Sequence, residues 1–264
     1  MMASNVLALY KRQLEEQDSL LREVASKRES GDTGLRFDLA SVSASSVGQQ
    51  YFCEKKVEMR LLHGGVETEA MQAGTEAHDL LLADSVNAKR NEIFQRIHLG
   101  EELLVREMYL LSKYHDVIMV GRPDAVFFYQ AAPYILFEYK FSRSPNPQES
   151  HHSQAKVYCR ILQSMGFDVS QLHYALVVIH TSRRSSEELR EKVTNMIISN
   201  GPREATLEED GANIHIYSYR PDDAEKDIDW ALGFWKKTRE ATPTKNPYKC
   251  RSCEYKVDCS SSFS

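Results

Sequence analysis

The most constraining feature of the sequence is a charged pair inside an apolar segment. Residues 134–141 are otherwise apolar or aromatic, which predicts a strand, and they include Glu138 and Lys140. Side chains two residues apart on a strand point to the same face, and burying them without partners would be costly. Asp124 directly precedes another predicted strand, residues 125–129, and a hairpin can bring its carboxylate beside Glu138.

Two carboxylates that converge in this way repel each other unless a cation or a shared proton relieves them. A hard divalent ion resolves the repulsion, and Lys140 can then orient an attacking water or stabilise developing negative charge. These are the parts needed to hydrolyse a phosphodiester. The alternative is an exposed hairpin face whose Glu–Lys pair contributes little.

The elements around the hairpin predict an α/β fold in which helices flank a central mixed sheet. The apolar spacing indicates helices at 6–29, 43–62, 68–83, 148–165, 186–198 and 222–239 and strands at 103–111, 117–120, 125–129, 134–141, 172–179 and 214–219. The first helix has apolar residues near heptad spacing over only about three heptads, which favours docking onto the body over zipper dimerisation.

The net charge of −5 gives no overall attraction to nucleic acid, so any positive DNA-binding surface must be local. A basic cluster near the C-terminal end is one candidate, although a solvated face explains it equally well: Lys236, Lys237, Arg239, Lys245, Lys249, Arg251 and Lys256. No segment approaches the roughly 18 apolar residues of a membrane span, and the N-terminus lacks a targeting pattern. We expect a soluble cytoplasmic protein.

Three further side chains could complete a nuclease site. His78 lies in the predicted helix 68–83, and imidazole suits Mn²⁺ alongside carboxylates. Gln154 and Tyr158 are four residues apart, so an amide and a phenol share one helical face shortly after the lysine strand. Satisfied polar side chains are the alternative explanation for all three.

Three of the five cysteines, Cys250, Cys253 and Cys259, fall within ten residues of one another. Structural disulfides are not expected in an intracellular chain, whereas three thiolates can hold zinc or an iron–sulfur cluster with one more ligand. Cys53 and Cys159 are the candidates for a fourth thiolate. A Cys₃His zinc site completed by His63 or His78 is the alternative.

The order of these motifs resembles that of the PD-(D/E)XK nucleases of the RecB-like branch, over roughly residues 41–259. The matching motifs are Gly74-x-x-x-His78, Gly121-Arg122-Pro123-Asp124, Glu138-Tyr139-Lys140 and Gln154-x-x-x-Tyr158. The resemblance implies a restriction-endonuclease-like core that binds Mg²⁺ or Mn²⁺.

Within that resemblance, the implied metal ligands are His78, Asp124, Glu138 and the backbone carbonyl of Tyr139. Lys140 is the implied catalytic lysine, together with Asp124 and Glu138. Gln154 and Tyr158 are implied to line the DNA channel near the scissile phosphate.

The cysteine pattern is similar to that of the CRISPR-associated iron–sulfur (Cas-four type) exonucleases, with exonuclease V as a relative. This likeness implies a [4Fe–4S] cluster held by Cys53, Cys250, Cys253 and Cys259. Cys159 is then a packed thiol. The cluster is implied to staple the helical N-terminal part to the C-terminal tail.

The same resemblance implies a DNA exonuclease that prefers single-stranded ends, often with 5′ to 3′ polarity. It also implies CRISPR spacer acquisition or DNA repair as the pathway, with CRISPR adaptation proteins or a separate helicase chain as the expected partners. A DNA-binding or partner-binding module that retains the fold but has weak catalysis is the alternative. We expect four segments: an N-terminal helix and linker (1–34), a helical region with the first cluster cysteine and the metal-ligand histidine (35–98), the nuclease core (99–240) and the cysteine tail (241–264).

Overall fold

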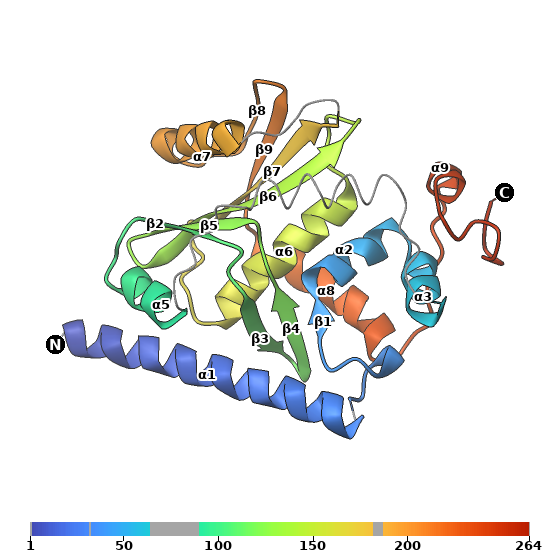
Figure 1. Ribbon diagram of the computed structural model, residues 1–264, viewed down its shortest axis with the longest axis horizontal. Helices are drawn as coiled ribbons and strands as arrows, with labels where there is room; N and C mark the ends of the chain where they lie inside the picture. Colours follow the sequence, from blue (N-terminus) through green and yellow to red (C-terminus); the bar gives the residue numbers. More distant parts are fainter. Residues whose placement is uncertain (1, 32, 64–89, 182–186, 264) are drawn as a thin grey trace.

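The computed structural model describes residues 2–31, 33–63, 90–181 and 187–263 (Figure 1). Its helices are α1 (Met2–Ser30), α2 (Ala44–Phe52), α3 (Glu54–His63), α5 (Arg90–His98), α6 (Glu149–Ser164), α7 (Glu187–Asn200), α8 (Pro221–Trp235) and α9 (Pro247–Arg251), with a 3₁₀ turn η1 (Arg36–Asp38). Its strands are β1 (Val42–Ser43), β2 (Leu103–Arg106), β3 (Leu110–Tyr114), β4 (Val117–Gly121), β5 (Ala125–Tyr129), β6 (Ala132–Ser142), β7 (His173–His180), β8 (Ala205–Glu209) and β9 (Ala212–Ser218).

A six-stranded sheet in the order β2-β5-β6-β7-β9-β8 forms the centre of the fold. The β6–β7 pair is parallel and the neighbouring pairs are antiparallel, which confirms the predicted mixed sheet. Helix α6 packs on one face, where Leu136 and Leu176 join the larger core, and α7 covers the other face through Val193 and Ile197. The expected α/β class, with helices flanking the sheet, is therefore confirmed.

A second, three-stranded sheet has the order β1-β4-β3. The single strand predicted at 103–111 is wrong, because β2 belongs to the six-stranded sheet and β3 to this one. Glu107 adopts a left-handed φ of 49° between them and turns the chain from one sheet to the other. The predicted turn at 130–133 is shorter in the structure, where Gln130 and Ala131 both have positive φ and connect β5 to β6 as in a tight hairpin.

The single helix predicted at 43–62 is also wrong, since α2 ends at Phe52 and α3 begins at Glu54. Cys53 separates them in an extended conformation with a φ of −172°. The side chain of Ser43 accepts a hydrogen bond from the Ser46 amide and caps the start of α2, as its sequence position indicates. The break lifts Cys53 out of a regular helix and places it between two helix ends.

The other predicted elements are found close to their expected places. The structure has α6 for the helix predicted at 148–165 and β7 for the buried strand at 172–179. The short strand β8 was not expected, because its sequence has only one large apolar residue, Leu207. The predicted helix at 68–83 lies outside the described residues. No helix in the described ranges is both long and apolar enough to cross a bilayer.

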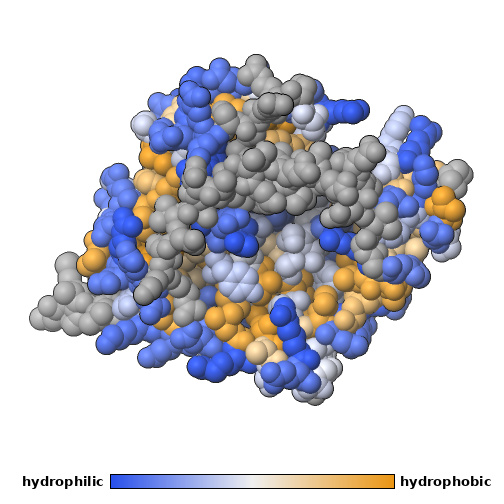
Figure 2. Space-filling view, viewed as in Figure 1, coloured by the Kyte–Doolittle hydropathy of each residue, from blue (hydrophilic) through white to orange (hydrophobic). Residues whose placement is uncertain are grey.

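Helix α1 docks along the three-stranded sheet, as expected from its short heptad pattern (Figure 1). Its inward face buries Leu14, Leu20 and Val24. Gln17 is 2% exposed; its amide nitrogen donates to the Leu111 carbonyl at 2.5 Å, and its amide oxygen accepts from the Leu111 N–H at 3.2 Å. One glutamine thus satisfies both backbone groups of Leu111 at the outer edge of β3, while the outward surface of α1 is mostly hydrophilic (Figure 2).

We expect Gln17→Ala to destabilise the protein, because it orphans the buried N–H and C=O of Leu111. Each orphaned group costs about 1–3 kcal/mol. Urea unfolding monitored by circular dichroism measures the loss, and Glu16→Ala on the exposed face of α1 is the matched control. Equal midpoints for the two variants would contradict the edge contact.

Candidate active site

The register of the β5–β6 hairpin places Asp124 beside the centre of β6. Ala125 lies opposite Phe137, and the ladder ends there because Pro123, two residues earlier, has no N–H to continue it. The carboxylate of Asp124 takes over at this point and accepts a hydrogen bond from the Tyr139 N–H at 2.6 Å. The hairpin geometry expected from the sequence is therefore present.

The N–H and C=O of one strand residue point toward the same neighbouring strand. Because the Tyr139 N–H points at Asp124, the Tyr139 carbonyl is directed to the same side, beyond the end of β5. The Tyr139 side chain lies on the face of the sheet that α7 covers, where its hydroxyl shares a hydrogen bond of 3.0 Å with the Thr194 hydroxyl. Tyr139 thus contributes its backbone N–H and C=O to the site, whereas its phenol lies outside it.

Strand alternation directs Glu138 and Lys140 toward α6, on the same face as Leu136. The Lys140 ammonium donates to Glu138 Oε1 at 2.7 Å and to Gln154 Oε1 at 3.0 Å. Gln154 Nε2 then donates to the phenol oxygen of Tyr158 at 2.8 Å. All four side chains form one connected network between β6 and α6.

The carboxylates at this site are buried, whereas Lys140 and Gln154 are half-buried and line the neighbouring cleft. Asp124 and Glu138 are each 3% exposed. Burial alone would lower the pKa of Lys140, but the negative charges of Glu138 and Asp124 outweigh it and raise that pKa above its ordinary value. Burial first, and then the charge of Glu138, raises the pKa of Tyr158 well above its usual range. At neutral pH the site therefore holds a lysine cation and a neutral phenol.

Two glycines allow the helices to approach the site. A Cβ on Gly121 would lie 2.5 Å from Tyr158 Cδ1, so the ring packs directly against the end of β4. A Cβ on Gly48 would lie 2.7 Å from the Ser150 carbonyl oxygen, so α2 rests against the first turn of α6. Only glycine fits at these contacts without moving the backbone or the ring.

A cleft of about 400 Å³ opens between α2, α3 and the start of α6, and it reaches the network at Lys140 and Gln154. Sequence reasoning missed the other residues that line it, which include Gln49, Lys56, Arg60, His151 and Glu254.

His151 forms a capping box with Gln148 at the start of α6. Burial, followed by the positive charge of Lys140, lowers its pKa to about 3, so the imidazole is neutral. A histidine three residues after a polar N-cap residue was the available signal for this cap.

The donor set around Asp124 suits a hard divalent cation. Two carboxylates and one backbone carbonyl are oxygen ligands of the kind that Mg²⁺ and Mn²⁺ prefer. His78, the remaining expected ligand, lies outside the described residues. Within the described ranges no three His, Cys, Asp or Glu side chains are grouped closely enough to hold a metal. The fit of a divalent cation to this site therefore depends on the carboxylates of Asp124 and Glu138 and on the Tyr139 carbonyl.

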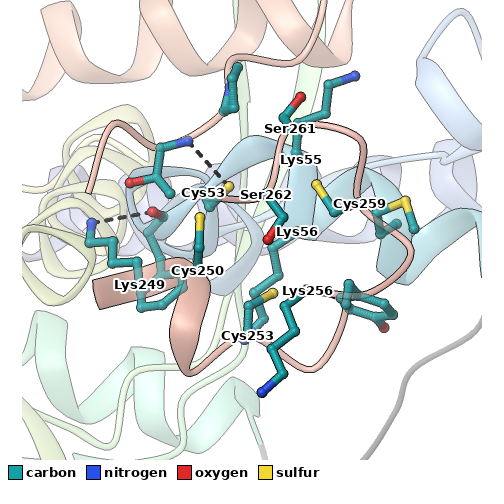
Figure 3. Close-up of a pocket in the computed structure, with 15 residues that line it drawn as sticks. Cys53, Lys55, Lys56, Lys249, Cys250, Cys253, Lys256, Cys259, Ser261 and Ser262 are labelled. Atoms are coloured by element: carbon teal, nitrogen blue, oxygen red, sulfur yellow. Dashed lines mark hydrogen bonds between the residues drawn. The ribbon is translucent and has the colours of Figure 1, made fainter. Parts of the chain in front are cut away.

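The four cysteines expected to act together line one pocket (Figure 3). Cys53 comes from the α2–α3 break, and Cys250, Cys253 and Cys259 come from the tail. The described cysteines are free thiols. Cys159 is fully buried in the main core and does not line the pocket, which agrees with its expected role as a packed thiol, and His63 does not line it either.

The buried carboxylate of Glu54 holds the tail near Cys53. Glu54 is fully buried and accepts hydrogen bonds from Arg239, from the Thr242 N–H and from Gln50. Lys249 donates to the carbonyls of residues 51 and 52. Arg239 and Lys249, two members of the basic cluster, thus make structural contacts.

A family model described as the PD-(D/E)XK nuclease superfamily matches residues 54–260, the segment that contains Asp124, Glu138 and Lys140. The crystal structure of SSO0001 is similar, with 17% sequence identity, a TM-score of 0.48 and coverage of 97% of this chain and 96% of that chain. An alkaline exonuclease from Laribacter hongkongensis aligns with 14% identity and a TM-score of 0.36, over 80% of this chain and 90% of that one. No curated protein gives a significant match.

We expect Gly121→Ala to destabilise the protein by about 1–3 kcal/mol through overpacking against the Tyr158 ring. In a Tyr158→Ala background the ring is absent, so the same substitution should cost much less. Urea unfolding of the four proteins in this double-mutant cycle measures the coupling. Equal costs in the two backgrounds would show that Gly121 does not position Tyr158.

Proposed function

The chain belongs to the PD-(D/E)XK nuclease superfamily, and from this membership we propose that it is a metal-dependent deoxyribonuclease. The observation that carries the proposal is a pair of buried carboxylates beside a cation: Asp124 accepts from the Tyr139 N–H, and Glu138, one residue earlier on β6, accepts from the half-buried Lys140 ammonium. An exposed Glu–Lys pair, the alternative considered from the sequence, does not describe carboxylates that are 3% exposed.

In this proposal Asp124, Glu138, the Tyr139 carbonyl and His78 hold Mg²⁺ or Mn²⁺. The bound ion supplies Lewis acidity and lowers the pKa of water. Lys140 acts as a cation that orients the water nucleophile and offsets negative charge on the phosphate. Its ammonium donates to Glu138 Oε1 at 2.7 Å, which favours this role over that of a general base, since a general base requires a neutral amine.

Gln154 and Tyr158 are proposed to contact the DNA beside the scissile phosphate. Gln154 already holds the Lys140 ammonium at 3.0 Å, so it fixes the direction of that charge. The Tyr158 phenol accepts from Gln154, which leaves its own proton to donate to a phosphate oxygen.

We further propose that the substrate is a single-stranded DNA end, processed with 5′ to 3′ polarity. The sequence resemblance to the CRISPR-associated iron–sulfur exonucleases and exonuclease V supports this assignment. CRISPR spacer acquisition and DNA repair are the two proposed settings, with adaptation proteins or a helicase as partners in the cytoplasm. A DNA-binding or partner-binding module with weak catalysis is the second candidate, and the cleft beside Lys140 is compatible with it.

The four pocket cysteines are proposed to hold a [4Fe–4S] cluster, with zinc as the alternative. Four free thiols from two distant segments line one pocket, which supports the assignment. Their sulfur atoms are not grouped as metal ligands in the described residues, so a bound cluster would draw them closer together. The proposed role is structural, joining the α2–α3 break to the tail.

We expect Asp124→Asn, Glu138→Gln and Lys140→Met each to lower DNA cleavage by about 100-fold or more, because each removes a ligand or a charge that stabilises the transition state. The assay uses single-stranded oligonucleotides labelled at the 5′ or the 3′ end, with Mg²⁺ or Mn²⁺ and with EDTA as a metal-free reaction. The order in which labelled products appear gives the polarity.

Asp116→Asn is the matched control, since Asp116 is an exposed carboxylate paired with Lys236 on the surface. Circular dichroism establishes that each variant folds. Folded variants of all three site residues that cleave as fast as the control would reject this site. DNA binding without any metal-dependent product in the parent protein would favour the second candidate.

We expect Cys53→Ser, Cys250→Ser, Cys253→Ser or Cys259→Ser to lower the iron content of anaerobically purified protein, from about four atoms per chain in the parent. Cys159→Ser is the matched control, because Cys159 does not line the pocket. Metal analysis and visible absorption measure the loss. A colourless parent protein that contains zinc would identify the alternative metal.

A further inference from the structure

The cleft between α2, α3 and α6 has an excess of positive charge next to the proposed catalytic network. It is lined by three cationic side chains, Lys56, Arg60 and Lys140, and by the carboxylate of Glu254. Its volume of about 400 Å³ falls in the range of roughly 300–1,000 Å³ typical of ligand sites. It is therefore large enough to receive part of one strand.

The three cations are not equally available to a ligand. Lys140 donates to Glu138 at 2.7 Å, and Lys56 pairs with Glu254 at 3.0 Å. Arg60 donates from one guanidinium nitrogen to the neutral amide oxygen of Gln49 at 2.9 Å, and it forms no ion pair within the described residues. Among the described residues, Arg60 is thus the cleft cation whose charge no carboxylate neutralises, and its guanidinium has further N–H donors.

The cleft lacks a free aromatic face among the described residues. The aromatic residues that line it are Phe52 and His151. The ammonium groups of Lys56 and Lys249 already lie over the Phe52 ring, 5.1 and 5.0 Å from its centroid. His151 is engaged in the cap of α6. Recognition in this cleft therefore depends on charge and hydrogen bonding, not on stacking with bases.

Glu254 links the cleft to the cysteine tail. Its side chain is 5% exposed, and it follows Cys253 directly. By neutralising Lys56 it removes one cation from the surface that a polyanion would meet. The tail thus sets the charge of the cleft as well as lining the cysteine pocket.

We propose that this cleft binds the phosphate backbone of single-stranded DNA flanking the scissile phosphate, with Arg60 as the phosphate anchor. Glu254 limits the affinity by keeping Lys56 paired. The recognition is independent of base sequence. This inference rests on the proposed function, since it extends the same site from the metal to the substrate strand.

The test measures binding and not cleavage. All variants are made in the full chain carrying Asp124→Asn, so that the protein does not degrade the DNA probe. Binding of fluorescein-labelled single strands of about 20 nucleotides, one of thymidine and one of mixed sequence, is followed by anisotropy over a range of salt concentrations. Each phosphate contact contributes a slope of about 0.7 in a plot of log K against log salt for a single strand.

The two side chains give opposite expectations. Arg60→Gln should weaken binding by about tenfold and reduce the slope by about 0.7, equally for both probes. Arg60→Lys should retain the slope. Glu254→Gln should strengthen binding and increase the slope, because it frees Lys56. Arg220→Gln removes an exposed arginine that pairs with Glu204 elsewhere and is the matched control.

Circular dichroism and metal content establish that Arg60→Gln and Glu254→Gln fold and load as the parent does. A folded Arg60→Gln protein with the slope of the control overturns the proposal, as does a change seen with only one base sequence. Cleavage by the parent without the Asp124 substitution is measured in parallel. If the salt slopes shift as expected but the parent does not cleave DNA, the cleft assignment stands and the nuclease proposal fails. If the parent cleaves DNA but the slopes do not shift, the nuclease proposal stands and the cleft assignment fails.

Discussion

The hydrogen bond from the Tyr139 amide to the Asp124 carboxylate fixes the geometry on which the rest of the site depends. A proline at 123 prevents the β5 backbone from pairing further along β6, and the Asp124 side chain fills the vacated position. Because β6 lies inside the six-stranded sheet, this bond ties the carboxylate to a rigid backbone. Strand alternation then turns Glu138 and Lys140 to the same face, where α6 supplies the remaining polar groups.

A second buried carboxylate, Glu54, organises the other half of the molecule. Its charge is compensated by the Arg239 guanidinium, which donates two hydrogen bonds of 2.6 Å each, so burial does not leave an unpaired ion. Since Glu54 directly follows Cys53, the same contact brings the tail to the cysteine at the helix break. The placement of Cys53 in one pocket with the other three cysteines is therefore supported by protein contacts.

The sequence predicted the parts of the site that depend on local periodicity. The alternation in 134–141 placed Glu138 and Lys140 on one face, and the spacing of Gln154 and Tyr158 placed both on one side of a helix. It could not reveal the turn at Glu107 or the break at Cys53, because neither position carries the glycine or proline that usually marks a break. Arg60 was missed for a different reason, as a cation on a helix surface has no local signature of the cleft that it faces.

The contacts of α1 also have a consequence for the order of folding. Gln17 bonds to Leu111, 94 residues away, and Gln13 bonds to the Met165 carbonyl, 152 residues away. The helix can form from its own sequence early, but its buried amides find their partners only after β3 and the end of α6 exist. Such distant pairings raise the contact order and slow folding, since a large loop must close before the contact stabilises it. We therefore expect docking of α1 to follow formation of the core.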